Sequence, residues 1–159
     1  MGYFLRVGTP GGVSPSARPA EVRFYFDADV LGLAKVIARL RFDATYPGDP
    51  GSIIHRHERP ACPIADSAVA DRVWIPEVAE RGWLIITRDR RIQDHRAEIA
   101  AVKDHQAKMV VLSSLEATTT WMQLEILMAS WRRIEPLHRL AGPFIFRATR
   151  TSTARVALE

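Results

Sequence analysis

Cysteine, lysine and long apolar runs are all scarce in this sequence. Cys62 is the single cysteine among 159 residues, which excludes an intramolecular disulfide and a cysteine-rich zinc site. No stretch approaches the roughly 20 consecutive apolar residues that cross a bilayer, and residues 1–7 are too short and too interrupted for a secretory signal. We therefore expect a cytoplasmic protein in a reducing compartment, without a membrane partner.

Arginine carries nearly all of the positive charge. The chain holds 22 Lys+Arg against 18 Asp+Glu, a net charge of +4, and its only lysines are Lys35, Lys103 and Lys108. Guanidinium groups suit bidentate binding of phosphate, but a GC-rich genome produces the same bias. The charge alone therefore identifies no partner.

One ordinary globular domain accounts for most of the chain. Its 47% hydrophobic and 25% charged residues are typical of such a domain. Residues 8–20 consist mainly of Gly, Pro, Ser, Thr and Ala, a composition that forms no packed element. We predict a disordered tail over residues 1–20 and a single domain over residues 21–159.

Short apolar runs alternate with amphipathic segments along the predicted domain. Apolar or β-branched runs predict strands at residues 22–26, 83–87 and 109–112, with a further short strand near residues 44–46. Apolar residues at helical spacing predict helices at residues 30–40, 73–81, 93–105 and 118–135. Residues 115–159 form a C-terminal extension of one helix and one or two edge strands. The alternation predicts an α/β fold, with a mainly parallel central sheet and helices on both faces.

Residues 43–70 form a long polar stretch between the first and second predicted helices. The stretch contains four prolines: Pro47, Pro50, Pro60 and Pro63. A loop of this length is uncommon in a compact domain and is usually functional or disordered. His55, His57 and Cys62 lie within it, but three scattered donors without a fourth make a poor zinc site, so we expect none.

Two aspartates follow predicted strands closely. Asp27 comes directly after the strand at 22–26, and Asp89 comes just after the strand at 83–87. The carboxyl ends of parallel strands meet at one edge of a sheet, where ligands bind, and Asp71 is placed to join them. Three hard oxygen donors suit Mg²⁺ or Mn²⁺, which promote phosphodiester hydrolysis. The alternative is that each aspartate only caps a helix.

Three segments together resemble a known family. They are Phe24-Tyr25-Phe26-Asp27-Ala28-Asp29, then Asp71 ahead of Trp74-Ile75-Pro76, and Gly82-Trp83-Leu84-Ile85-Ile86-Thr87-Arg88-Asp89. This pattern, over about residues 22–113, resembles a PIN-like domain, and more narrowly the actinobacterial VapC-type toxins of toxin–antitoxin pairs. The resemblance implies a three-layer α/β sandwich in which Asp27, Asp71 and Asp89 bind Mg²⁺ or Mn²⁺ and cleave RNA.

The sequence departs from the family pattern at one acidic position. PIN nucleases commonly show a fourth acid, and no residue here matches it well; Asp94 and Asp29 are the candidates. Because PIN-like domains without activity also exist, the departure leaves catalysis open.

Basic residues surround Asp89. They are Arg88, Arg90, Arg91, His95 and Arg96. Beside a metal site such residues hold RNA phosphates, and the alternative is a solvated basic face. A looser group near the C-terminus is expected to form a solvated face and comprises Arg132, Arg133, Arg139, Arg147 and Arg150.

The last predicted helix carries large apolar residues at helical spacing. Trp121, Leu124, Met128 and Trp131 share one face, which we expect to pack in the core. If exposed, this face would suit a second subunit or an antitoxin.

Two functions remain open from the sequence. The first is a Mg²⁺- or Mn²⁺-dependent endoribonuclease, the toxin of a pair, with RNA, a cognate antitoxin and a second copy of the chain as partners. The second is an inactive PIN-like module that binds RNA or a protein partner without cutting.

Overall fold

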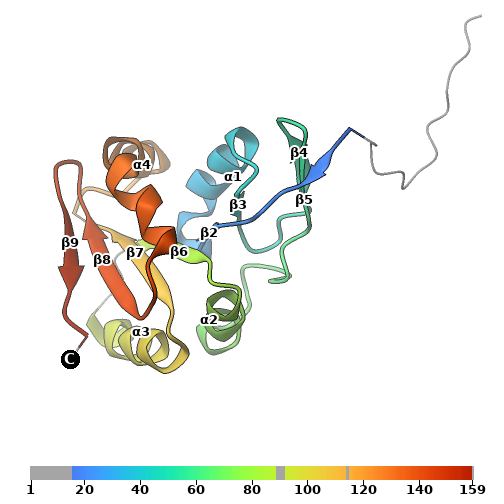
Figure 1. The fold of residues 1–159 in the computed structure, drawn as a ribbon. Coiled ribbons are helices and arrows are strands. Elements are labelled where there is room, and N and C mark those ends of the chain that lie inside the picture. Colours follow the sequence, from blue (N-terminus) through green and yellow to red (C-terminus); the bar gives the residue numbers. More distant parts are fainter. Residues whose placement is uncertain (1–15, 89–91, 114, 159) are drawn as a thin grey trace, which may run out of the picture.

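The chain folds around a six-stranded sheet with helices on both faces (Figure 1). The computed structural model describes residues 16–88, 92–113 and 115–158, and for residues 92–95 the backbone only. The strands in spatial order are β3 (Ala44–Thr45), β2 (Phe24–Phe26), β6 (Leu84–Arg88), β7 (Lys108–Leu112), β8 (Phe144–Ala148) and β9 (Thr153–Val156). Of these six strands, only β9 runs antiparallel to its neighbour. The predicted α/β fold with a mainly parallel sheet is confirmed.

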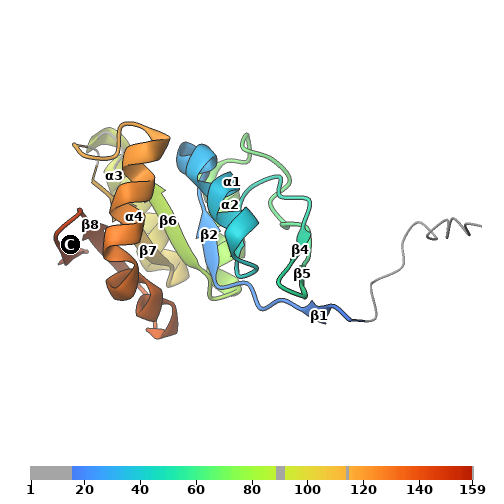
Figure 2. The same cartoon turned by 90° about the horizontal axis from the view of Figure 1, so that it is seen from above.

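Four helices cover the two faces of the sheet (Figures 1 and 2). One face carries α1 (Leu31–Leu40) and α4 (Thr120–Ile134), and the other carries α2 (Asp71–Glu80) and α3 (Ile92–His105). Two short 3-10 helices, η1 (Ala28–Val30) and η2 (Glu135–Arg139), precede α1 and follow α4. No helix in the described part of the chain is both long and apolar enough to cross a membrane.

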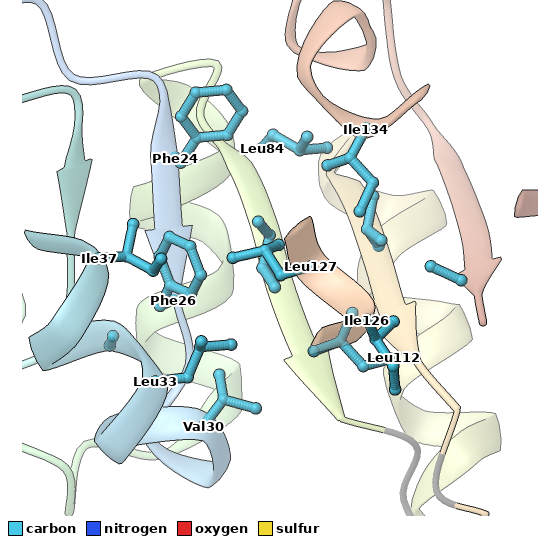
Figure 3. Close-up of a cluster of buried hydrophobic side chains, with 14 of the residues drawn as sticks. Phe24, Phe26, Val30, Leu33, Ile37, Leu84, Leu112, Ile126, Leu127 and Ile134 are labelled. Carbon is cyan, nitrogen blue, oxygen red and sulfur yellow. The ribbon is translucent and has the colours of Figure 1, made fainter. Parts of the chain in front are cut away.

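The alternation of side chains along the central strands creates two apolar cores. Phe24, Phe26 and Leu84 pack against α1 and α4 (Figure 3). Tyr25 and Ile85 point the other way and pack against α2 and α3. Both faces of the central strands are therefore buried, which explains why the strand at 83–87 reads as a continuous apolar run.

The register between β2 and β6 brings two strand ends to the same edge of the sheet. The two strands pair in parallel, with Phe26 opposite Ile86. The Asp27 N–H then donates to the Ile86 carbonyl over 2.9 Å, which extends the ladder beyond β2. Asp27 consequently lies next to Thr87 in the neighbouring strand.

Helix α2 begins two residues before the start that its periodicity predicts. Ala70 precedes it in an extended conformation, so Asp71 is the first helical residue. Gly82 follows the helix with a φ of +72°, the left-handed conformation of a glycine that ends a helix. The early start places Asp71 in the first turn, where a carboxylate is stabilised by the helix dipole.

The long stretch at residues 43–70 contains regular structure. β4 (Ser52–Ile54) and β5 (His57–Arg59) form an antiparallel hairpin, and β1 (Arg18–Pro19) pairs with β5 in parallel. Strand pairing therefore begins before residue 21, the domain boundary that the composition predicted, while residues 1–15 of the predicted tail lie outside the described residues.

A buried ion pair ties this hairpin to the main domain. The side chains of Arg59 and Asp49 are 3% and 1% exposed, and Arg59 Nε donates to Asp49 Oδ2 over 2.7 Å. Arg59 Nη1 also donates to the carbonyls of Ala38 and Arg41, each over 3.0 Å, at the end of α1. Thr45 Oγ1 donates to Asp49 Oδ2 over 2.9 Å, so the pair joins the hairpin, α1 and β3.

Helix α4 exposes part of the face that we expected in the core. Trp121 and Met128 are each 70% exposed, so the prediction was wrong for these two residues, whereas Leu124 and Trp131 pack partly buried against the core. The buried stripe is shifted around the helix and comprises Gln123, Ile126, Leu127, Ser130 and Ile134. Its two polar members bond to backbone carbonyls, which removes the cost of burying them.

The buried pair generates the first prediction. Arg59→Met should lower the free energy of unfolding by about 3–5 kcal/mol, because the Asp49 carboxylate would stay buried without its cation. Urea denaturation followed by tryptophan fluorescence measures the change. Arg56→Met, an exposed change at the turn of the same hairpin, is the control and should alter stability by less than about 0.5 kcal/mol. Equal midpoints for the two variants would contradict the anchoring role of Arg59.

Candidate active site

Asp27 is a buried carboxylate that both caps a helix and faces the sheet edge. It is 2% exposed, and its Oδ1 accepts a hydrogen bond from the Ala28 N–H over 2.6 Å at the start of η1. Its Oδ2 lies 3.1 Å from Thr87 Oγ1 in β6. The capping alternative is therefore realised at Asp27, and only one of the two carboxylate oxygens is used for it.

The Thr87 hydroxyl lies within hydrogen-bonding distance of the carboxylates of both Asp27 and Asp29. Besides Asp27 Oδ2, its hydroxyl oxygen lies 3.0 Å and 2.9 Å from the two carboxylate oxygens of Asp29. Asp29 Oδ2 also accepts the N–H of Arg88 over 3.3 Å. A hydroxyl carries one proton and can donate to one oxygen at a time, so the carboxylates of Asp27 and Asp29 compete for the Thr87 proton. Such a cluster favours a cation.

Asp71 is held by an aromatic side chain rather than by a helix cap. The Trp74 Nε1–H donates to Asp71 Oδ1 over 2.9 Å. The residue in the capping position is Ala70, whose side chain makes no capping bond, so capping does not explain Asp71. The Trp74 ring in turn lies against the Tyr25 ring, with centroids 5.0 Å apart.

One pocket brings these acids together. It has a volume of about 400 Å³, and its lining includes Asp27, Asp29 and Asp71. Asp66 also lines it, an exposed residue whose Oδ1 accepts the Ala68 N–H over 2.8 Å. Asp66 was not predicted from the sequence, because a loop aspartate outside any periodic segment carries no signal until the chain folds. We call this feature the acidic pocket.

The pKa of the Tyr25 phenol is shifted at the acidic pocket. Burial is the main cause that raises the pKa of the Tyr25 phenol above its usual range, and the negative charge of Asp27 adds to it. The phenol therefore keeps its proton at neutral pH and acts as a hydrogen-bond donor or as a neutral acceptor.

Several predicted site residues lie beyond what the structure describes. Asp89, Arg90 and Arg91 lie outside the described residues, and so do the side chains of Asp94 and His95 at the start of α3. Arg88 ends β6 and is partly buried, and Arg96 is exposed on α3. The structure thus brings together Asp27, Asp71 and the fourth-acid candidate Asp29.

The acidic pocket has the donor chemistry of a site for a hard cation. Its carboxylate oxygens suit Mg²⁺ or Mn²⁺ better than a soft metal. Among the described residues, however, no group of three or more His, Cys, Asp or Glu side chains is arranged to hold a metal ion.

His55, His57 and Cys62 are not among the residues that line the acidic pocket. His57 stacks on Phe42, with ring centroids 4.0 Å apart, and its Nδ1 lies 2.9 Å from the His55 carbonyl. Cys62 is half-buried, and burial raises the pKa of its thiol. The C-terminal arginines are exposed, as expected for a solvated face, and Arg150 pairs with Glu125 over 3.0 Å.

Comparison with known proteins identifies one family. Residues 22–114 match a family described as PIN like domain. No curated protein and no solved structure matches the chain. The matched segment contains both strands that meet at the acidic pocket.

The shared donor generates the second prediction. Thr87→Val keeps the shape of the side chain but removes the hydroxyl beside Asp27 and Asp29, so the free energy of unfolding should fall by about 1.5–3 kcal/mol. Chemical denaturation in a metal-free buffer measures it. The matched control is Thr151→Val in the exposed turn between β8 and β9, which should be nearly neutral. If Thr87→Val is as stable as the parent, the hydroxyl does not hold the carboxylates.

Proposed function

The chain belongs to the PIN-like domain family, a nuclease-type fold, and we propose that it is a Mg²⁺- or Mn²⁺-dependent endoribonuclease that hydrolyses phosphodiester bonds of RNA. The observation that carries the proposal is the acidic pocket at the carboxyl ends of β2 and β6, where Asp27, Asp29 and Asp71 meet. Clustered carboxylates at this edge of a parallel sheet are suited to a cation and its phosphate ligand.

Each acid has its own proposed part. Asp27 and Asp71 are metal ligands together with Asp89, and Asp29 or Asp94 supplies the fourth acid. A bound Mg²⁺ or Mn²⁺ ion would polarise the phosphate and supply an acidified water. Thr87 and the Ala28 N–H orient the Asp27 carboxylate, and Trp74 orients that of Asp71. These contacts fix two carboxylates before any ligand arrives.

The basic residues near the end of β6 are proposed to bind the RNA backbone. Arg88 follows Thr87 directly, so its side chain begins at the same edge of the sheet as the acids. With Arg90, Arg91 and His95 it would neutralise phosphates next to the acidic pocket and so position the scissile bond.

An inactive PIN-like module that binds RNA or a protein is the second candidate. The observation that favours it is that the described acids form no group of three metal-holding side chains. A Mn²⁺ titration separates the two candidates. Saturable binding that is lost in Asp89→Asn supports the nuclease, whereas RNA binding that ignores both the metal and the mutation supports the inactive module.

The role of toxin requires a protein partner, and we propose that the partner binds an exposed apolar groove. The groove between α1 and α4, of about 380 Å³, includes Leu40 and Met128, which are 61% and 70% exposed. Exposed apolar patches of this kind mark protein-binding surfaces. Arg41 and Arg132 also line the groove, so the proposed occupant is an apolar segment of the antitoxin that carries acidic side chains.

The catalytic proposal gives the third prediction. Asp89→Asn should abolish Mg²⁺-dependent cleavage of RNA while the melting temperature in metal-free buffer stays equal or rises, because a repelled charge is lost and the size is kept. Cleavage is measured on labelled RNA and melting by scanning calorimetry.

The control for this experiment is Asp104→Asn, an exposed acid in the last turn of α3. It should leave cleavage and melting unchanged. Metal-dependent cleavage by Asp89→Asn, in a preparation shown to be free of contaminating nuclease, would refute the assignment and leave the inactive module or another active site.

The partner proposal gives the fourth prediction. Met128→Glu places a negative charge in the groove and should weaken binding to the co-expressed product of a small neighbouring reading frame at least tenfold, through burial of an unpaired charge and repulsion of an acidic segment. Size-exclusion chromatography and calorimetry measure binding. Val73→Glu alters an exposed apolar residue of α2 and is the matched control. If Met128→Glu instead dissociates a homodimer, a second copy of the chain occupies the groove.

A further inference from the structure

Tyr25 has a buried hydroxyl that makes no hydrogen bond to the described residues. Its side chain is 0% exposed, and its hydroxyl oxygen lacks a partner in the described part of the chain. A buried polar group without a partner costs free energy, and such groups in native proteins call for an explanation. The Tyr25 ring packs in the apolar core on the α2 and α3 side of the sheet, where a phenylalanine ring would pack without this cost.

The position of Tyr25 connects it with the acidic pocket. Tyr25 lines the pocket, and its ring packs against Trp74. The same Trp74 donates its Nε1–H to Asp71. The phenol therefore belongs to the aromatic pair that already holds one carboxylate of the proposed metal site.

Asp71 fits the phenol as a partner better than Asp27 does. Both carboxylate oxygens of Asp27 already lie near donors, Oδ1 near the Ala28 N–H and Oδ2 near the Thr87 hydroxyl. Asp71 sits at the first turn of α2, is partly exposed, and shares its aromatic support with Tyr25. In the metal-free chain the charge of Asp27 acts on the pKa of the phenol more strongly than that of Asp71, so the pairing with Asp71 applies to the metal-bound state.

We propose that Tyr25 is a positioning residue of the acidic pocket: when a divalent cation is bound, its hydroxyl donates to the Asp71 carboxylate, together with Trp74 Nε1. Carboxylates that bind a metal are usually held by such hydrogen bonds, and their loss typically weakens metal binding about 10- to 100-fold. This inference rests on the proposed metal-dependent function.

The test is a Mn²⁺ titration of the full chain, followed by electron paramagnetic resonance. Tyr25→Phe should raise the Kd for Mn²⁺ about tenfold or more, while the melting temperature without metal stays equal or rises, because an unpartnered buried hydroxyl is removed. A merely structural tyrosine would show the reverse, a lower melting temperature and an unchanged Kd. Tyr46→Phe, at a partly buried tyrosine that is not among the residues lining the acidic pocket, should change neither.

A double-mutant cycle identifies the carboxylate. If Tyr25 acts through Asp71, Tyr25→Phe should have no further effect on the Kd in an Asp71→Asn background. A full additive effect there would overturn the pairing with Asp71. An unchanged Kd in Tyr25→Phe, with Mn²⁺ still bound by the parent chain, would overturn the inference and leave the proposed function standing. Failure of the parent chain to bind Mn²⁺ would overturn both.

Discussion

The parallel register between β2 and β6 is the constraint on which the acidic pocket depends. Pairing of Phe26 with Ile86 and the further backbone bond from Asp27 to Ile86 set Asp27 next to Thr87. Because side chains alternate along a strand, a slip of one residue would turn Asp27 into the opposite core and move Tyr25 away from Trp74. The apolar residues on both faces of these strands oppose such a slip, so the cores that stabilise the fold also fix the position of the acids.

The supports of the acidic pocket come from elements that are far apart in sequence. Asp27 is held by η1 and β6, whereas Asp71 is held by an aromatic residue one turn further along α2. On the other side of β2, the Asp49–Arg59 pair closes the hairpin against α1 and β3. Helices α1 and α2 both pack against the same short strand, β2, through their apolar residues. Its three residues are fully buried, and this burial makes β2 the common wall of the two cores.

Much of the fold could be predicted from the sequence, because buried parallel strands and amphipathic helices leave strong periodic patterns. The strands at β2, β6 and β7 and all four helices were predicted near their observed bounds. The hairpin β4–β5 was not, since its strands are short and its turn residues His55 and Arg56 adopt positive φ, a conformation that usually signals glycine or asparagine.

At the acidic pocket, Asp27 and Asp71 were predicted from strand ends and helix starts. Asp66 and the contact between Trp74 and Asp71 arise only from tertiary packing. The exposure of Met128 was not predicted, because polar residues in a helix are expected to face solvent. In α4 the polar residues Gln123 and Ser130 are buried instead, since they bond to backbone carbonyls, and Met128 lies on the exposed side.

The antiparallel strand β9 forms one edge of the sheet and pairs with β8, which would otherwise be the edge strand. The guanidinium carbon of Arg155 in β9 lies 5.3 Å from the centroid of the Phe146 ring, so the outermost strand carries a positively charged side chain. At the opposite side, β3 is only two residues long. A charged outer strand and a very short one both offer a poor template for the backbone of another chain. The two borders of the sheet are therefore built against edge-to-edge aggregation.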